Sequence, residues 1–322
     1  MNTKKTLKIV FAVLAVLVLA LIVFLGMKIF SKLRLPVNTL HVAENTLTVS
    51  GLSEEYKIFL IADSHISLVD DRDPDVKSKA LSRQASFTTN GIPGHQYFKQ
   101  LLKRAEKDES DIIILGGDII DSAMYASVDY VYEQTSSLKT PFLYLTGNHD
   151  FEYGNEYFSE TAYTQYKSRL FEIHGINNYR IAEYDDLVVF SADDENNQIS
   201  EEALKAYKEV AKKGKPMVVC LHVPLEPKEA GSEFVQACKD IWGASDDGHS
   251  RVSIGPEGCY MNETTQEFRN LVLAKDSPVV LVLAGHIHFY RNDALTANTR
   301  QIVTGAAYEG NAVEVTLRPP QR

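Results

Sequence analysis

Residues 147–150 read Gly-Asn-His-Asp, and residues 285–288 read Gly-His-Ile-His. Each tetrapeptide directly follows an apolar run, 141–146 or 278–284, whose length and Val, Leu and Phe content are typical of a buried strand. In open α/β sheets, ligands bind at the carboxyl ends of the strands, so polar clusters at such ends are expected to converge on one site. Three further apolar runs end in the same way: 56–62 before Asp63-Ser64-His65, 111–116 before Gly117-Asp118, and 217–221 before His222.

Apolar runs alternate with amphipathic segments along most of the chain, which predicts an α/β fold with a largely parallel sheet. Ser200 is expected to cap a helix, because its hydroxyl can accept a hydrogen bond from the first helical turn. The stretch 223–263, rich in Gly, Ser, Asp and Pro, is expected to be an insertion between core strands that caps the cleft. Strands are predicted at 56–62, 111–116, 141–146, 187–192, 217–221, 278–284, 301–304 and 312–317, and helices at 95–108, 124–137, 159–172, 200–213 and 264–274.

The N-terminal region contains nineteen consecutive residues, 9–27, without a charged or strongly polar side chain. As a helix this run would span about 28 Å, close to the hydrocarbon thickness of a bilayer. A cleaved signal peptide has a shorter apolar stretch and small residues at its cleavage site, and neither feature is present here. The sequence therefore predicts a single transmembrane anchor at 9–30, after a cytoplasmic tail at 1–8. A linker is expected at 31–44 and a folded domain at 45–322.

The orientation of the anchor follows from its flanking charges. Three lysines and the terminal amine precede the apolar run, and three basic residues follow it, a slight preference for a cytoplasmic N-terminus. The layout, a long apolar segment ahead of a large domain, resembles a signal anchor. We therefore expect a protein of the cell membrane whose domain lies outside the cytoplasm.

The charge of the chain argues against one class of partner. Residues 1–34 hold six basic and no acidic residues, which leaves 27 basic and 43 acidic residues, a formal charge of −16, in residues 35–322. Such a domain repels a polyphosphate backbone, so no extended nucleic acid is expected as a partner. Three cysteines are too few for a disulfide framework, although pairing of Cys238 with Cys259 stays open. The sequence does not indicate an oligomeric state.

The strand-end clusters offer carboxylates, one carboxamide oxygen and several imidazoles, but no thiolate. Such oxygen and nitrogen ligands suit Mn, Fe or Zn. Seven candidate ligands exceed the four of one tetrahedral site, whereas two divalent ions sharing a carboxylate would use all of them. Paired ions about 3.5–4 Å apart stabilise in-line displacement at phosphorus and lower the pKa of a bound water. Gly117, Gly147 and Gly285 precede ligands where the backbone is expected to turn sharply.

These motifs, in this order over residues 63–288, resemble the calcineurin-like metallophosphoesterase superfamily. The resemblance implies a four-layer α/β/β/α sandwich with a dinuclear metal centre between the strand-end loops. It further implies that His149 contacts the phosphate and protonates the leaving oxygen, with Asp150 orienting its imidazole. Position by position, it implies that Asp63, His65 and His288 hold one ion, that Asn148, His222 and His286 hold the other, and that Asp118 bridges both.

The resemblance implies a metal-dependent phosphoesterase in which a metal-bound hydroxide attacks phosphorus. A small-molecule or lipid-linked phosphate ester is the first expectation for the substrate, because the motifs bind phosphate and metals rather than the attached group. A cyclic-nucleotide phosphodiesterase is the alternative, since class III enzymes of that kind have a similar motif set. A non-catalytic, protein-binding member could dispense with the proton donor, whereas this chain keeps His149. Asp121 is interpreted as a helix N-cap, Asp193 and Asp194 as turn or cap residues, and Trp242 as packing for the insertion.

Overall fold

The computed structural model describes most of the domain but not the N-terminal region. Among the described residues, no helix combines the length and the apolar character needed to cross a bilayer. The predicted anchor at 9–30 and almost all of the predicted helix at 159–172 lie outside the described residues. The description covers residues 40–150, 178–194, 196–228, 232–244 and 252–321, together with Arg169, Ile173 and Gly175.

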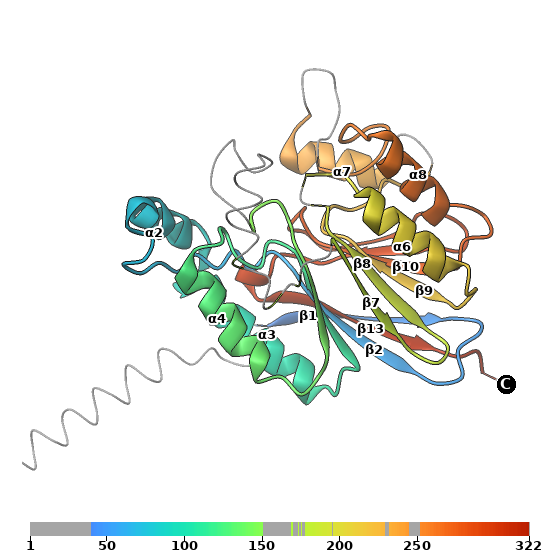
Figure 1. Cartoon of the computed structure of the whole chain (residues 1–322), viewed down its shortest axis with the longest axis horizontal. Coiled ribbons are helices and arrows are strands. Elements are labelled where there is room, and N and C mark those ends of the chain that lie inside the picture. Colours follow the sequence, from blue (N-terminus) through green and yellow to red (C-terminus); the bar gives the residue numbers. More distant parts are fainter. Residues whose placement is uncertain are drawn as a thin grey trace, which may run out of the picture. The chain divides into compact units, whose positions relative to one another are not determined.

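Two sheets form the centre of the domain (Figure 1). In spatial order, the first consists of β1 (His41–Thr48), β13 (Asn311–Arg318), β2 (Tyr56–Ile61), β5 (Ile112–Gly116) and β6 (Phe142–Leu145). The second consists of β11 (Arg291–Ala294), β12 (Arg300–Val303), β10 (Val279–Ala284), β9 (Met217–Cys220), β8 (Val188–Ala192) and β7 (Tyr179–Glu183). Strands β2, β5 and β6 are parallel, as are β8, β9, β10 and β12, so within each group the carboxyl ends lie at one edge.

Helices cover the outer face of each sheet (Figure 1). They are α3 (Gly94–Lys107) and α4 (Tyr125–Ser136) on the first sheet, and α6 (Glu201–Ala211) and α8 (Glu263–Val272) on the second. The remaining elements are η2 (Pro74–Val76), α2 (Lys77–Ser86), α7 (Glu233–Trp242), η3 (Ala307–Glu309) and a two-stranded ribbon of β3 (Thr88–Thr89) and β4 (Ile92–Pro93).

Three buried apolar clusters show how the layers are stacked. One cluster lies between the two sheets, where Ile114 of β5 and Val218 of β9 both belong to it. A second joins the first sheet to α3 and α4 through side chains such as Leu101. A third joins the second sheet to α6 and α8 through Tyr207 and Phe268. The domain therefore has four layers, in the order helix, sheet, sheet, helix.

Strand β5 illustrates why the predicted strands read as continuous apolar runs. Successive side chains of a strand point to opposite faces. Ile112 and Ile114 accordingly join the cluster between the sheets, whereas Ile113 and Leu115 join the cluster beneath α3 and α4. Because both faces are buried, neither can be polar.

The predicted strands are all present, each within one residue of its expected ends. The predicted cap is also present: the Ser200 hydroxyl accepts a hydrogen bond of 3.1 Å from the Ala203 N–H at the start of α6. The prediction missed β1, β7, β11, α2 and α7. Strand β1 begins at His41, inside the range expected to be a linker, and pairs in parallel with β13.

Several described residues of the segment 223–263 belong to the core. Leu225 and Ile254 are fully buried in the cluster between the second sheet and its helices. The buried Glu226 carboxylate accepts hydrogen bonds from the Ser253 hydroxyl at 2.8 Å and the Glu257 N–H at 2.9 Å. The segment lies between the core strands β9 and β10 in the chain, as expected of an insertion, and part of it contributes to the core. Cys238 and Cys259 do not form a disulfide.

Candidate metal centre

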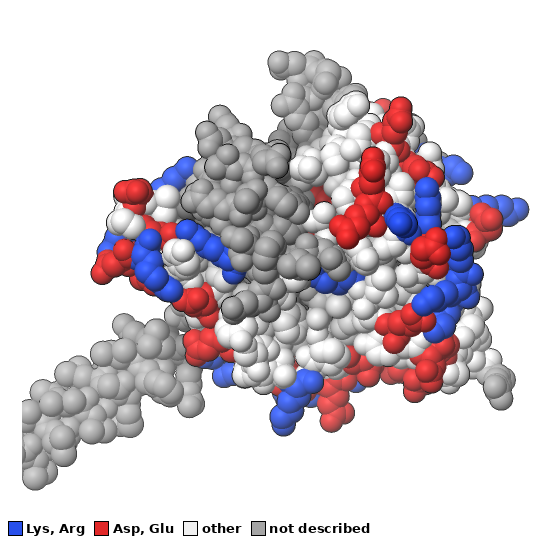
Figure 2. All heavy atoms as spheres, viewed as in Figure 1, with Lys and Arg blue, Asp and Glu red and all other residues white. Residues whose placement is uncertain are grey.

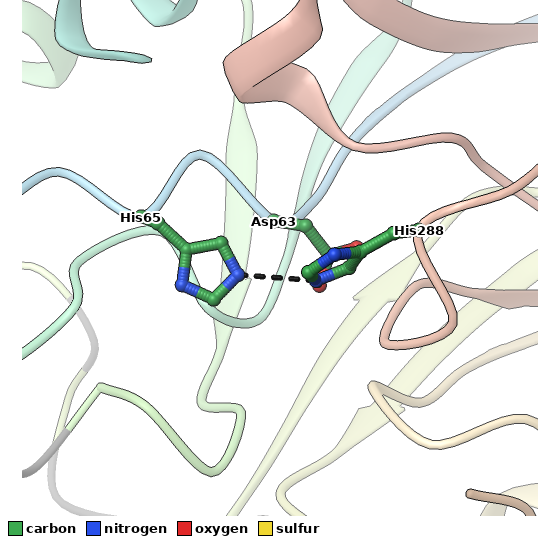
Figure 3. Close-up of side chains that lie close together, drawn as sticks. All are labelled: Asp63, His65 and His288. Atoms are coloured by element: carbon green, nitrogen blue, oxygen red, sulfur yellow. Dashed lines mark hydrogen bonds and ion pairs between the residues drawn. The ribbon is translucent and has the colours of Figure 1, made fainter. Parts of the chain in front are cut away.

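The predicted ligands gather at the carboxyl ends of β2, β5, β6, β9 and β10. Asp63, His65 and His288 form one group, and their side chains point toward one another (Figure 3). His288 Nε2 lies 3.4 Å from Asp63 Oδ1 and 3.2 Å from His65 Nε2. Potential ligand atoms at such separations can share one ion.

A second group contains Asp118, His222 and His286. His222 Nε2 lies 3.3 Å from Asp118 Oδ2 and 3.2 Å from His286 Nδ1. The same Asp118 oxygen lies 3.8 Å from His65 Nε2, which belongs to the first group. One carboxylate oxygen therefore faces both groups, as a bridging ligand would.

Asn148, the remaining predicted ligand, lies in the loop after β6. Its Oδ1 atom is buried and makes no hydrogen bond within the described structure. A buried carbonyl oxygen without a partner is costly, because its desolvation is not repaid. This oxygen has no hydrogen-bond partner in the described structure, and the donor set contains only oxygen and nitrogen atoms. Both features fit divalent cations.

Five of the predicted ligands have left-handed backbone conformations. Residues other than glycine rarely adopt them, and such strain concentrates at functional sites. The φ angles are 58° for Asp63, 44° for His65, 49° for Asp118, 72° for His286 and 61° for His288.

Glycines allow the ligand loops to approach one another. Gly117 has a φ of 85°, a conformation that a side chain strains. Gly147 is needed for a different reason, since a Cβ there would lie 2.4 Å from Asp118 Oδ1 and 2.7 Å from His222 Cδ2. The expected sharp turn thus explains the first glycine, and close packing explains the second.

The electrostatics of the site are set by two buried carboxylates. Burial raises the pKa values of Asp63 and Asp118, but the neighbouring histidines outweigh it and hold both below the ordinary value. Burial lowers the pKa of His222, yet Asp118 outweighs it and raises the value to about 10. Burial, reinforced by His222, lowers the pKa of His286 to about 3. A bound cation would compete with the proton on His222 for the same carboxylate.

Asp150 does not have the role that the sequence suggested. Its carboxylate accepts hydrogen bonds from the N–H groups of Gly147 at 2.6 Å, Asp118 at 2.9 Å and Ile120 at 3.1 Å, and from the Tyr144 hydroxyl at 2.7 Å. The expectation that it orients His149 is therefore wrong. Asp150 instead ties the loop after β6 to the loop after β5.

Asp121 occupies the position expected of Asp150. Its Oδ1 atom lies 3.1 Å from His149 Nδ1 and 3.1 Å from His65 Nδ1. The interpretation of Asp121 as a helix cap is wrong, because Met124 is the N-cap of α4. Burial lowers the pKa of His149, but Asp118 and then Asp121 outweigh this effect and raise it.

The sequence did not show every residue that supports the site. The Asp194 carbonyl accepts a hydrogen bond of 2.7 Å from the Asn197 N–H, as the interpretation of a turn requires. Its carboxylate also accepts hydrogen bonds of 2.9 Å from the N–H groups of His222 and Val223, so Asp194 holds a predicted ligand loop as well. Its place directly after a predicted strand was the available signal. Phe87 stacks on His65 with ring centroids 4.0 Å apart, and no motif marks it.

Trp242 connects α7 to the site. Its indole N–H donates a hydrogen bond of 2.9 Å to the carbonyl of Ile287, between two of the histidines. Its ring and the His288 ring are nearly perpendicular, with centroids 5.4 Å apart, and 47% of the residue stays exposed. The interpretation of Trp242 as a packing residue is thus confirmed, and the residue it packs against is a predicted ligand.

Residues 56–290 match the family model for calcineurin-like phosphoesterases. The chain belongs to this family. It is accordingly a phosphoric ester hydrolase, and the donor groups described above lie within the matched range.

Two solved structures are similar to the chain at low sequence identity. A dimetal phosphatase from Danio rerio is 12% identical, with 79% of this chain and 88% of that chain covered and a TM-score of 0.49. A purple acid phosphatase from yellow lupin (Lupinus luteus) seeds is 15% identical, with 85% of this chain covered and a TM-score of 0.48. The chain spans 47% of the lupin protein. No curated protein sequence matches the chain.

The close approach at Gly147 yields a test. Gly147→Ala should disrupt metal binding and activity, because the new methyl group would collide with Asp118 and His222. Gly214→Ala is the matched control: Gly214 has a φ of 67° and open space around its Cα. The control should lose about 1–2 kcal/mol of unfolding free energy and keep its metal content. Elemental analysis and denaturant titration measure both effects, and normal metal content in Gly147→Ala would contradict the packing argument.

Proposed function

We propose that this hydrolase acts through two divalent ions, Mn, Fe or Zn, held by the seven predicted ligands. One ion would be held by Asp63, His65 and His288, and the other by Asn148, His222 and His286. The observation that carries the proposal is the position of Asp118 Oδ2, 3.3 Å from His222 and 3.8 Å from His65, between the two groups. When bound, the ions would supply positive charge for the phosphate and lower the pKa of the attacking water.

The protein's own residues would supply positioning and a proton. His149 is partly exposed, with 23% of its side chain accessible, so a substrate can reach it. Because Asp121 engages Nδ1, Nε2 is the nitrogen that can donate. We propose that His149 protonates the leaving oxygen when the P–O ester bond breaks.

The proposed substrate is a small-molecule or lipid-linked phosphate ester. Support comes from the charge distribution, since on the face in Figure 2 basic side chains lie among acidic ones rather than in a separate patch. Such a face does not attract a polyanion over a long distance. Bound ions would make only the site itself attractive to an anion.

A substrate screen tests the proposed activity. The purified full-length protein, supplied with Mn, Fe or Zn in turn, should hydrolyse phosphomonoesters or phosphodiesters in a metal-dependent way. A chelator should abolish turnover, and the metal should restore it. Fastest turnover of cyclic nucleotides would favour the alternative function, and no hydrolysis of any ester with any metal would refute the proposal.

Two variants separate metal binding from proton donation. Asp118→Asn should lower the content of both ions, because the shared oxygen loses its charge. His149→Ala should keep two ions per chain while kcat falls by about 10²–10⁴-fold. Elemental analysis beside kinetics measures both. Loss of an ion from His149→Ala would instead make His149 a ligand, a role its distance to His65 and Asp118 allows.

We also propose that residues 9–30 anchor the protein in the cell membrane, with the domain outside the cytoplasm. The support is the uncharged run at 9–27 and its flanking charges. Protease added to intact cells or protoplasts should digest the domain while a cytosolic marker survives. Protection until the membrane is breached would reverse the orientation and favour a nucleotide substrate.

A further inference from the structure

Helix α2 lies outside the five sequence motifs described above, yet it borders the site. It lies between the ligand loop after β2 and the start of α3, and it presents Arg83 toward Asp121. The Arg83 side chain is 30% exposed, whereas that of Asp121 is fully buried. The partly exposed guanidinium group of Arg83 therefore contacts the buried carboxylate of Asp121.

The contact between Arg83 and Asp121 is forked. Arg83 Nε lies 2.7 Å from Asp121 Oδ2, and Nη2 lies 2.7 Å from Oδ1. Two parallel charge-assisted hydrogen bonds fix a carboxylate in direction as well as in distance. Nη2 also lies 3.3 Å from His149 Nδ1. Arg83 thus contacts both Asp121 and the proposed proton donor.

Asp121 Oδ1 links the metal site to the proton donor. It receives Arg83 Nη2, His65 Nδ1 and His149 Nδ1 together. A buried carboxylate without a cationic partner would be costly. Because Arg83 compensates that charge, Asp121 can accept an Nδ1–H hydrogen bond from each of the two imidazoles without either ring having to be cationic.

Phe87, just beyond α2, adds a second contact to the same assembly. The Arg83 guanidinium lies 4.7 Å from the centre of the Phe87 ring, and this ring stacks on His65 at 4.0 Å and an angle of 7°. Phe87 therefore packs on the face of His65, and Arg83 packs on Phe87, while Asp121 contacts the edge of the His65 ring.

We propose that Arg83 is a positioning residue for the hydrolysis, acting through Asp121 on the His149 imidazole. The proposal rests on the proposed function. Water adds its oxygen to phosphorus, the ester P–O bond breaks, and the leaving oxygen takes the Nε2 proton of His149, which a proton from the attacking water replaces. Arg83 keeps Nδ1 on Asp121 during this transfer, so that Nε2 faces the leaving oxygen.

The kinetic test compares Arg83→Met and Arg83→Lys with the control Arg72→Met in the full chain. Arg72 pairs with Asp70 and Asp129 at the surface. Arg83→Met should retain two ions per chain. Its kcat should fall by about 10–100-fold for alkyl esters, whose leaving groups need a proton, and by less than about threefold for activated aryl esters.

Two further results distinguish positioning from a structural role. Added guanidinium ion should restore part of the alkyl-ester activity of Arg83→Met. The kcat of Arg83→Lys for alkyl esters should lie between those of the wild type and Arg83→Met, because an ammonium group cannot bind the carboxylate in a bidentate way. The Arg72→Met control should have the kcat of the wild type for both classes of ester. An equal loss for all leaving groups, a loss of metal, or no loss at all would overturn the proposal.

A measurement that needs no turnover separates this inference from the proposed function. In histidine-labelled wild type, NMR should show a slowly exchanging imidazole N–H that disappears in His149→Ala, the Nδ1 proton held by Asp121. Arg83→Met should broaden or remove this signal, and Arg72→Met should leave it unchanged. An unchanged signal in Arg83→Met overturns the positioning role. If Arg83→Met loses this signal but the wild type hydrolyses no ester, the positioning role stands and only the proposed function is refuted.

Discussion

The arrangement of the site follows from the burial of six aspartates at one edge of two sheets, since each buried charge needs compensation. Four of them are compensated by the protein itself: Asp121 by Arg83, and Asp150, Asp193 and Asp194 by hydrogen bonds that include backbone N–H groups. Asp63 and Asp118 face mainly imidazoles and receive few backbone hydrogen bonds. A bound cation would therefore be stabilised most by these two carboxylates.

Short parallel strands are enough to bring these groups together. Each ligand loop begins where a strand of four to six residues ends, and the strands are buried on both faces. The loops then pack closely enough that Gly147 cannot carry a side chain. Asp150 and Asp194 fix the backbones of these loops, so the ligands are held before any ion binds. Such preorganisation avoids an ordering cost on binding.

Two segments outside the sheets complete the walls of the site. Helix α7 reaches the loop that holds His286 and His288 through Trp242, and α2 reaches the proposed proton donor through Arg83 and Asp121. Both helices lie outside the shared motifs. Because the motifs are proposed to hold metals and phosphate, these walls are where selectivity for the leaving group and control of His149 are expected to reside.

The sequence by itself determined the strands that are buried on both faces and the set of candidate ligands. Continuous apolar runs and the glycine-containing motifs at their ends depend only on local chain order. The edge strands β1, β7 and β11 escaped detection because they are half exposed and owe their conformation to pairing with neighbours. Only the tertiary structure decided that Asp121, rather than Asp150, meets His149, because the paths of two different loops determine which carboxylate lies beside the imidazole. It also brought Arg83, 38 residues before Asp121 in the chain, onto that carboxylate. No periodicity or motif encodes such a contact, since it exists only once the layers have packed.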